Sequence, residues 1–250
     1  MKWEALLQRS LSIGADYIAT GHYARIEQLA NGRYAIANSV TAAKDQTYAL
    51  YNLTQEQLAR TLMPVGEYSK DRIREMADEI GLLVAHKPDS QDICFVPDGD
   101  YASFIENTTD QVLPTGNFVT PEGKVLGKHK GIIHYTVGQR KGLGLALGYP
   151  AFVLEIRPET NEVVIGTYEE SLTYTVRANE LNFMSVEQIT EPVRIFAKIR
   201  YNHKGAWCTV ERTGEDEIVC TFDEPIRAAT PGQAVVLYDG EYVLGGGTIL

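Results

Sequence analysis

The chain has 250 residues, of which 44% are apolar and 22% are charged, a composition typical of a soluble globular protein with one to three domains. No apolar run is long enough to cross a bilayer, the N-terminal residues lack a signal-peptide core, and three cysteines are an odd number for a disulfide scaffold. A formal net charge of −10 argues against nonspecific nucleic-acid binding over the whole surface. We expect a cytoplasmic protein with free thiols.

The first hundred residues alternate helical and strand patterns, which is typical of an α/β domain. Capping residues at the start and small residues at the end predict helices at residues 2–13, 54–61 and 70–80. Short apolar runs predict strands at residues 16–20, 24–28, 33–37 and 82–85. The first of these strands ends at Gly21-His22, a position where an open α/β sheet places ligands.

Two short motifs in this region carry polar side chains. Thr20-Gly21-His22-Tyr23 ends a strand, and glycine there allows a ligand to approach the backbone. Lys44-Asp45-Gln46-Thr47-Tyr48 offers a cation, an anion, an amide and a ring, which suit phosphate contact and base stacking. From these residues alone, a plain turn and a solvated helix entrance are the favoured interpretations.

Cys94 lies in a short connection between Pro88 and Pro97, within the run Asp89-Ser90-Gln91-Asp92-Ile93-Cys94-Phe95. Reactive side chains are often displayed on such connections. The two flanking carboxylates raise the pKa of a thiol, which disfavours an ordinary thiolate nucleophile. A functional Cys94 therefore needs a positive partner, or a sulfur species that is more acidic than a thiol.

From residue 101 to 166, short strands and many glycines follow a brief helical turn at residues 101–106. Strands are predicted near Val119 and at residues 123–127, 135–138, 151–156 and 162–166. From residue 171 onward the pattern is nearly pure strand and indicates a small β-barrel. Its predicted strands cover residues 193–201, 207–212, 218–222, 234–238 and 242–244.

Basic residues gather in the central region. The segment 124–141 contains five of them and two histidines but no acidic residue, while the rest of the chain has 18 basic and 33 acidic residues. The five basic residues are Lys124, Lys128, Lys130, Arg140 and Lys141. A local cationic patch on an acidic body suits a polyanion that docks in one place, and the glycine-rich end of the segment fits the backbone of a folded RNA. An ordinary basic surface loop is the alternative.

Cys208 and Cys220 flank a predicted turn near Gly214, and their spacing predicts that they face each other across two strands. We interpret them as packing thiols, because directly opposed strand cysteines make strained disulfides. No pair of cysteines or histidines has the spacing of metal ligands, so no metal site is expected.

Several segments together resemble one family, the bacterial tRNA-specific 2-thiouridylases. They are residues 14–25, 44–48, 63–66, 89–95, 131–144 and 245–247. The resemblance implies the C-terminal half of an ATP-pyrophosphatase-like α/β domain, a partial nucleotide-binding domain of the PP-loop type, at residues 1–100. It further implies a mainly β central tRNA-binding domain at residues 101–168 and a C-terminal β-barrel at residues 169–250.

The family also implies a reaction. ATP, acting with Mg²⁺, adenylates the oxygen at C2 of the wobble uridine in tRNAs for Lys, Glu and Gln, and persulfide sulfur supplied by a donor protein replaces that oxygen. By resemblance, Cys94 carries the persulfide and Gly21 lies against ATP. The residues implied to contact tRNA are His22, Lys44, Asp45, Gln46, Arg200, Tyr201 and Gln233, and the basic segment adds Arg140 and Lys141.

The sequence departs from the family in one respect. The family has a Ser-Gly-Gly-x-Asp-Ser loop that cradles the pyrophosphate of ATP, a partner cysteine and a nearby aspartate, and none of them has a counterpart here. We expect the chain to begin downstream of them and to be inactive alone. Two other hypotheses remain: a non-catalytic tRNA-binding module, and a cysteine hydrolase that pairs Cys94 with His86.

Overall fold

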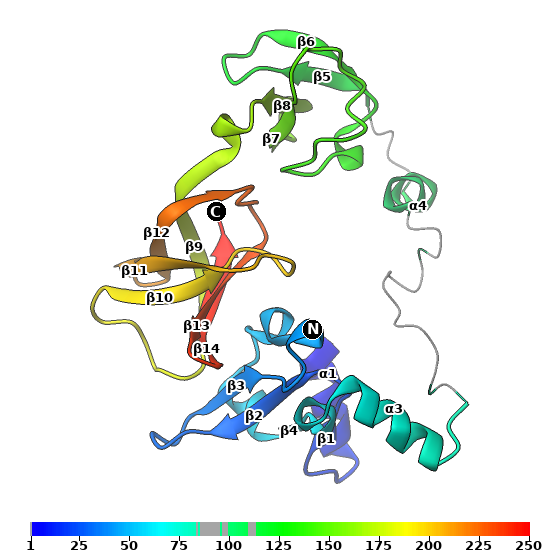
Figure 1. Ribbon diagram of the computed structural model, residues 1–250, viewed down its shortest axis with the longest axis vertical. Coiled ribbons are helices and arrows are strands. Elements are labelled where there is room, and N and C mark those ends of the chain that lie inside the picture. The colour runs from blue at the N-terminus through cyan, green and yellow to red at the C-terminus, as the bar shows by residue number, and fades with distance from the viewer. Residues whose placement is uncertain (1, 84, 86–95, 97–99, 110–113) are drawn as a thin grey trace. The chain divides into compact units, whose positions relative to one another are not determined.

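The computed structural model describes residues 2–83, 85, 96, 100–109 and 114–250 (Figure 1). The chain forms two compact units. Unit 1 contains residues 1–87, 174–224 and 230–250, and unit 2 contains residues 88–173 and 225–229. Within the described residues, no helix has both the length and the apolar character required to cross a membrane.

The chain contains four α-helices, five 3-10 helices and fourteen strands among the described residues. In the first segment the elements are α1 (Lys2–Ser12), β1 (Ile18–Ala19), β2 (Ala24–Gln28), β3 (Tyr34–Asn38), η1 (Ala42–Lys44), η2 (Thr47–Leu50), α2 (Gln55–Ala59), β4 (Thr61–Leu62), η3 (Pro64–Glu67) and α3 (Lys70–Glu79). The middle segment contains α4 (Tyr101–Thr108), β5 (Gly116–Val119), β6 (Val125–His129), η4 (Ile132–His134), β7 (Phe152–Arg157), β8 (Glu162–Gly166) and η5 (Glu169–Ser171). The last segment contains β9 (Leu172–Phe183), β10 (Val193–Lys198), β11 (Ala206–Gly214), β12 (Glu217–Arg227), β13 (Ala234–Asp239) and β14 (Tyr242–Ile249).

Side-chain caps fix the predicted helix starts. Thr54 and Gln57 form a reciprocal capping box at α2, with nitrogen–oxygen distances of 3.3 and 3.1 Å. The Ser69 hydroxyl accepts a hydrogen bond from the Arg72 backbone at 3.1 Å and caps α3. Gly14 follows α1 with a φ of +87°, a conformation that glycine adopts without strain. These features confirm the three predicted helices, although α2 ends at Ala59 because the next residues pair with β1.

Two strand predictions are wrong. Leu82 and Leu83 of the predicted strand 82–85 belong to no strand, and Leu83 is fully exposed, because an apolar run forms a strand only where a partner completes its ladder. In the run 135–138, Tyr135 packs into the core of unit 2, and the chain then turns at Gly138, whose φ is +85°. The Gly138 amide donates to the Val153 carbonyl at 2.8 Å and the Val153 amide donates to the Gln139 carbonyl at 2.9 Å, so a pair of bonds to one residue replaces the predicted ladder.

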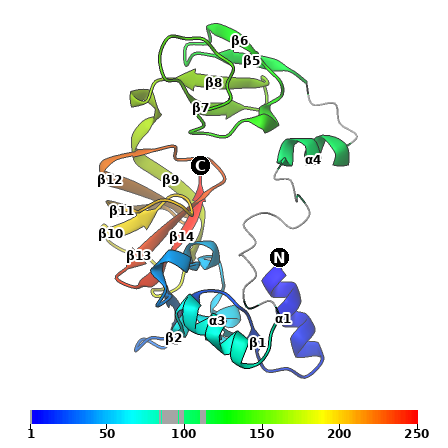
Figure 2. The same ribbon diagram turned by 45° about the vertical axis from the view of Figure 1, so that its right-hand side comes forward.

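Strands β9 to β14 form a closed barrel, in the order β13-β10-β11-β12-β9-β14, which closes through pairing of β13 with β14. The strands β10 to β14 are coloured yellow to red in Figure 2. The predicted barrel is confirmed, and the hairpin β2–β3 extends its sheet where Ala37 pairs with Tyr242 of β14. The N-terminal segment is thereby continuous with the barrel.

Three consecutive glycines let β14 approach its neighbours closely. A Cβ atom on Gly245 would lie 2.4 Å from the Asn182 carbonyl oxygen, and one on Gly246 would lie 2.4 Å from the Val235 carbonyl oxygen. Backbone atoms cannot move away cheaply, so these positions exclude any side chain. The glycine run is therefore a packing requirement of the barrel.

The prediction that Cys208 and Cys220 face each other directly is wrong. Cys208 pairs with Phe222, and Cys220 pairs with Val210, so the two cysteines are diagonal neighbours. A register irregularity between Arg212 and Gly214 shifts the centre of the turn and causes the difference. Both thiols are buried and free, and a hydrogen bond to Cys208 together with burial raises the pKa of the Cys220 thiol well above its ordinary value.

Unit 2 is built on the sheet β6-β5-β8-β7, in which β5 and β8 run parallel. His129 is buried beside Phe118 and Tyr135, with ring centroids 5.5 and 5.6 Å away. Its Nδ1 accepts the Gly131 amide at 3.0 Å, and its Nε2 donates to the Asn161 carbonyl at 3.1 Å. Only a neutral imidazole can accept and donate at once, so His129 is a core residue and not part of the basic surface.

We predict that acid destabilises unit 2 through His129. Burial lowers the pKa of His129 below its ordinary value of 6.5. The unfolded state then binds the proton more readily than the folded state does. The contribution of neutral His129 to the stability of unit 2 is therefore complete above pH 6.5 and is lost as the pH falls through the folded-state pKa. NMR titration of the imidazole, and urea unfolding of the chain as a function of pH, measure the two effects.

His129→Gln is the matched variant, because glutamine can accept from Gly131 and donate to Asn161 without titrating. We expect the variant to lose less stability than the wild type on acidification. Equal losses in the two proteins would contradict the prediction.

Candidate nucleic-acid interface

Two polar motifs far apart in the sequence meet in unit 1. The hydroxyl of Tyr201, which follows β10, donates to the Asp45 carbonyl at 3.1 Å across a separation of 156 residues. The Tyr201 ring also packs edge-on against Tyr48, with centroids 6.2 Å apart. Lys44, Asp45 and Gln46 therefore lie beside Arg200 and Tyr201, an arrangement that no local sequence pattern predicts. Half of the Tyr201 side chain surface remains accessible, since the residue is 48% exposed.

The Asp45 carboxylate is engaged within the chain. It accepts the amides of Ser39 and Thr47 at 2.9 and 3.2 Å and the Thr47 hydroxyl at 2.5 Å. These three bonds fix the turn between η1 and η2. Asp45 consequently holds the loop that carries Lys44 and Gln46, with its own carboxylate turned toward the protein backbone.

A layer of tyrosines lies beneath this turn. The Tyr48 hydroxyl donates to the Ala234 carbonyl at 2.8 Å, and Thr47 shares a 3.3 Å hydrogen bond with the Tyr238 hydroxyl. Burial raises the pKa of Tyr48 to about 12 and also raises the pKa of Tyr238, so both phenols stay neutral. Tyr48 is buried and supports the turn, while its bond to Ala234 brings the adjacent Gln233 to the same region.

Cations surround the tyrosine layer. The Lys198 ammonium lies 5.4 Å from the Tyr238 ring centroid. Burial, followed by the charges of Arg200 and Lys198, lowers the pKa of His203 below 6.5. Lys44, Lys198 and Arg200 give the region a positive charge within an acidic protein, which suits contact with phosphate.

His22 and Gly21 lie at the end of β1. The His22 Nδ1 lies 3.0 Å from the Thr20 hydroxyl, its ring packs 5.2 Å from that of Trp3, and burial lowers its pKa. A Cβ atom on Gly21 would meet no atom within 4 Å. The next residue joins this strand end to the Lys44 loop, since Tyr23 and Gln46 exchange hydrogen bonds of 2.9 and 3.0 Å.

Seven predicted site residues thus gather around one part of unit 1, in the loop after β1, the turn between η1 and η2, and two barrel loops. They are His22, Lys44, Asp45, Gln46, Arg200, Tyr201 and Gln233. Thr47 and Tyr238, which support them, were missed by sequence reasoning, because their roles depend on contacts between distant segments.

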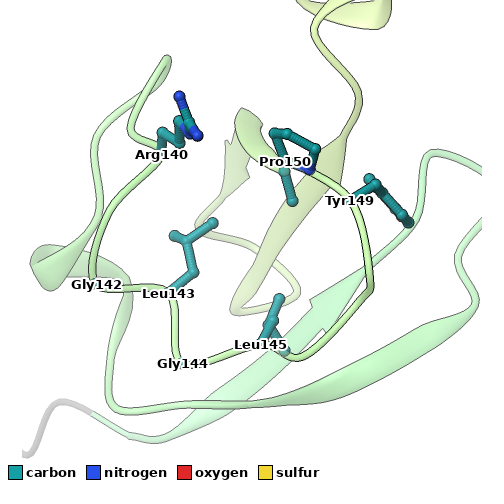
Figure 3. A pocket seen from close by; sticks show the side chains of 8 residues that line it. Arg140, Gly142, Leu143, Gly144, Leu145, Tyr149 and Pro150 are labelled. Atoms are coloured by element: carbon teal, nitrogen blue, oxygen red, sulfur yellow. The ribbon is translucent and has the colours of Figure 1, made fainter.

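Arg140 and Lys141 belong to unit 2 and are exposed there, as are Lys124, Lys128 and Lys130. Gln139 shapes their loop: its side chain accepts the Thr136 amide and donates to the Lys141 carbonyl, each at 3.0 Å. Arg140 stands at the rim of a hollow in this loop (Figure 3).

Cys94 and its run 89–95 lie outside the described residues, as does His86. Within the described part of the chain, no group of three or more His, Cys, Asp or Glu side chains could hold a metal ion.

Family models match the chain in three consecutive segments. Residues 1–98 match the tRNA methyl transferase HUP domain, residues 102–167 the tRNA methyl transferase PRC-barrel domain, and residues 173–249 the aminomethyltransferase beta-barrel domain. The predicted fold class, an α/β segment followed by a mainly β central part and a C-terminal barrel, is confirmed.

Curated relatives match the chain over its whole length. It is 65% identical to the tRNA-specific 2-thiouridylase MnmA of Lachnoclostridium phytofermentans over 250 residues, which are all of this chain and 70% of that relative. Identities to the proteins of the same name from Clostridioides difficile and Acetivibrio thermocellus are 51% and 53%, again over the whole chain and 69% and 70% of the relatives. The resemblance seen in the motifs is therefore confirmed, and the chain belongs to the tRNA-specific 2-thiouridylase family.

Proposed function

We propose that this chain serves in the ATP-dependent transfer of sulfur to C2 of the wobble uridine of tRNA, in the cytoplasm. Relatives that are 51% to 65% identical are named tRNA-specific 2-thiouridylases. In the proposed reaction Cys94 carries persulfide sulfur from a donor protein, and the acceptors are the tRNAs for Lys, Glu and Gln.

One observation carries the proposal, namely the contact of Tyr201 with Asp45. It joins two motifs that the family resemblance independently associates with tRNA. The joined surface offers cations for phosphate and one half-exposed ring, a combination suited to RNA backbone and an unstacked base. Asp45 acts by positioning, and Lys44, Arg200 and Tyr201 are the side chains proposed to touch RNA.

The residues at the end of β1 fit one wall of a nucleotide site. Gly21 follows a strand that pairs in parallel with β4, and the space around it is open. Backbone without a side chain there allows ATP to approach closely. ATP, with Mg²⁺, would supply the adenylyl group that turns the C2 oxygen into a leaving group. Gly21, which has no side chain, would leave space for ATP beside the backbone.

The proposed role of Cys94 follows from its acidic neighbours. A persulfide is more acidic than a thiol, so it remains ionised, and nucleophilic, where carboxylates would keep a thiol protonated. Cys208 and Cys220 do not suit this role, because both are buried. Cys94 is therefore the cysteine that we propose to carry the persulfide.

A non-catalytic tRNA-binding module is the second candidate. The observation that favours it is the acid-free basic segment 124–141 of unit 2, whose lysines and arginine are exposed, because such cations can bind RNA without any chemistry. Such a module would keep the cationic surfaces and would need neither ATP nor Cys94.

Loss of Lys44 should weaken tRNA binding by removing a phosphate contact. For Lys44→Ala we expect the slope of log affinity against log salt to fall by about 1, measured with a tRNA transcript at several salt concentrations. Arg72→Ala is the matched control, since Arg72 is an exposed cation of α3 in the same unit, paired with Glu75 and Glu79. Equal effects of both variants would argue against a localised interface.

Cys94→Ser separates the enzyme from the binding module. We expect the wild-type chain, incubated with a low-molecular-weight persulfide donor, to gain one sulfur atom at Cys94 by mass spectrometry, and the variant to gain none. Cys208→Ala should behave like the wild type, because its thiol is buried. Unchanged tRNA affinity in all three proteins, without sulfur on Cys94, would favour the binding module.

The isolated 250-residue chain should neither consume ATP nor thiolate tRNA, because it contains no pyrophosphate-cradling run of the family type. Addition of a polypeptide that carries this run and a second cysteine should restore thiolation. A thiolation assay with radiolabelled sulfur tests this, and robust activity of the chain alone would contradict it.

A further inference from the structure

Trp3, near the start of α1, packs against His22, which follows β1. The two ring centroids lie 5.2 Å apart, and the ring planes are tilted by 43°. Figure 2 shows α1 and β1 as neighbours within unit 1. Trp3 belongs to none of the motifs that resemble the family, yet its ring contacts a residue of the candidate interface. The role of Trp3 therefore has to be inferred from its contacts.

Hydrogen bonds and core packing fix the Trp3 ring. Its indole Nε1 donates to the Thr61 hydroxyl at 2.9 Å, and that hydroxyl donates in turn to the Gln57 carbonyl at 2.7 Å. The Gln57 side chain also donates to Glu4, the residue after Trp3, at 2.8 Å. Thr61 is buried, and the ring itself packs against the hydrophobic core of unit 1. Trp3 is thus a rigid support that ties the start of α1 to the end of α2.

His22 is held by two contacts that leave one ring nitrogen available. Its Nδ1 lies 3.0 Å from the Thr20 hydroxyl, and its ring is partly covered by Trp3. Among the residues that the structure describes, its Nε2 has no hydrogen-bond partner. The two nitrogens of an imidazole have distinct roles when one of them is engaged. The arrangement therefore leaves Nε2 as the atom of His22 that can bind a ligand.

The same contacts decide the charge of His22. Burial lowers the pKa of His22 below 6.5, and no charged side chain of the described residues contributes to the shift. The imidazole is therefore mainly neutral at pH 7. A neutral Nε2 can form a hydrogen bond with an uncharged group, whereas cations such as Lys44 attract phosphate through charge. His22 is thus suited to a contact that does not depend on salt.

We propose that Trp3 is a positioning residue for RNA recognition, which holds His22 so that Nδ1 stays on Thr20 and Nε2 meets an uncharged hydrogen-bonding group of the tRNA. The proposal rests on the proposed function, that the chain binds tRNA. It is supported by the position of His22, because the next residue, Tyr23, exchanges hydrogen bonds with Gln46 of the tRNA-contact motif. Trp3 acts through His22 and does not itself touch the RNA.

The test is a double-mutant cycle that measures affinity for a tRNA transcript at pH 7.5. We expect Trp3→Leu and His22→Ala each to weaken binding by about fivefold, the scale of one hydrogen bond. The double variant should bind no more weakly than His22→Ala, because the effect of Trp3 passes through His22. Neither variant should change the slope of log affinity against log salt, in contrast to Lys44→Ala.

Two further variants of α1 serve as controls. Trp3→Phe keeps an aromatic ring beside His22 and should retain most of the affinity. Leu6→Ala replaces an apolar residue of the same helix that is 49% exposed, and it should bind like the wild type. The thermal unfolding temperature of each variant shows whether unit 1 is folded.

NMR titration of His22 supplies a readout that needs no RNA. The pKa of His22 should rise toward 6.5 in Trp3→Leu, because the indole no longer buries the imidazole, and should stay unchanged in Leu6→Ala. If Trp3→Leu does not fold, Thr61→Val takes its place, since it releases the indole with a side chain of similar shape, and changes in the same direction are expected.

An unchanged pKa of His22 in the folded variant, or additive losses of affinity in the cycle, would overturn the positioning role while the wild type still binds tRNA. Failure of the wild type to bind the tRNA transcript would instead overturn the proposed function.

Discussion

Close packing around the glycines of β14 is the constraint on which unit 1 depends. β14 pairs with β13, which closes the barrel, with β9 on its other side, and with β3 of the N-terminal hairpin. At Gly246 a side chain would collide with the Val235 carbonyl and with the ring of Tyr51, 2.8 Å away. The same glycine run thus permits barrel closure and brings the N-terminal segment onto the barrel, where Asp45 meets Tyr201.

The acidic net charge and the proposed affinity for RNA are compatible because the cations are concentrated. In unit 1 they surround neutral tyrosines, and in unit 2 they lie along an acid-free stretch beside a hollow. Beside the cations of unit 1, the Tyr201 ring is half exposed. Localised charge combined with an aromatic face gives affinity at chosen places, while the acidic remainder of the surface repels RNA elsewhere.

Local features of the fold could be predicted from the sequence, and nonlocal ones could not. The caps at Thr54 and Ser69 act within one helical turn, so they identified α2 and α3. The strand predicted at residues 82–85 depended on a partner, and the register of Cys208 and Cys220 depended on one irregularity in a ladder. His129 looked like part of a basic surface because its burial comes from Phe118 and Tyr135, which approach only in the folded state.

In the candidate site, too, the individual motifs could be predicted from the sequence, but their contacts with distant segments could not. The family motifs identified Lys44, Asp45 and Gln46, but their proximity to Arg200 and Tyr201 follows from barrel closure and cannot be read from local spacing. Similarly, the supporting hydroxyls of Thr47 and Tyr238 carry no sequence signal of their own. Charge and glycine content indicated the loop of Arg140, whereas its hollow became evident only from the backbone conformation.

The pairing of β3 with β14 has a consequence for synthesis of the protein on the ribosome. The strand that completes the sheet beside Ala37 includes Tyr242, which is translated about 200 residues later, or roughly 10–40 s at ordinary elongation rates. During that interval the hairpin β2–β3 has an open edge and the apolar faces of its neighbours have no barrel to cover them. Nascent chains of this protein should therefore need protection by chaperones, and slow translation of the barrel segment should lower the yield of folded protein.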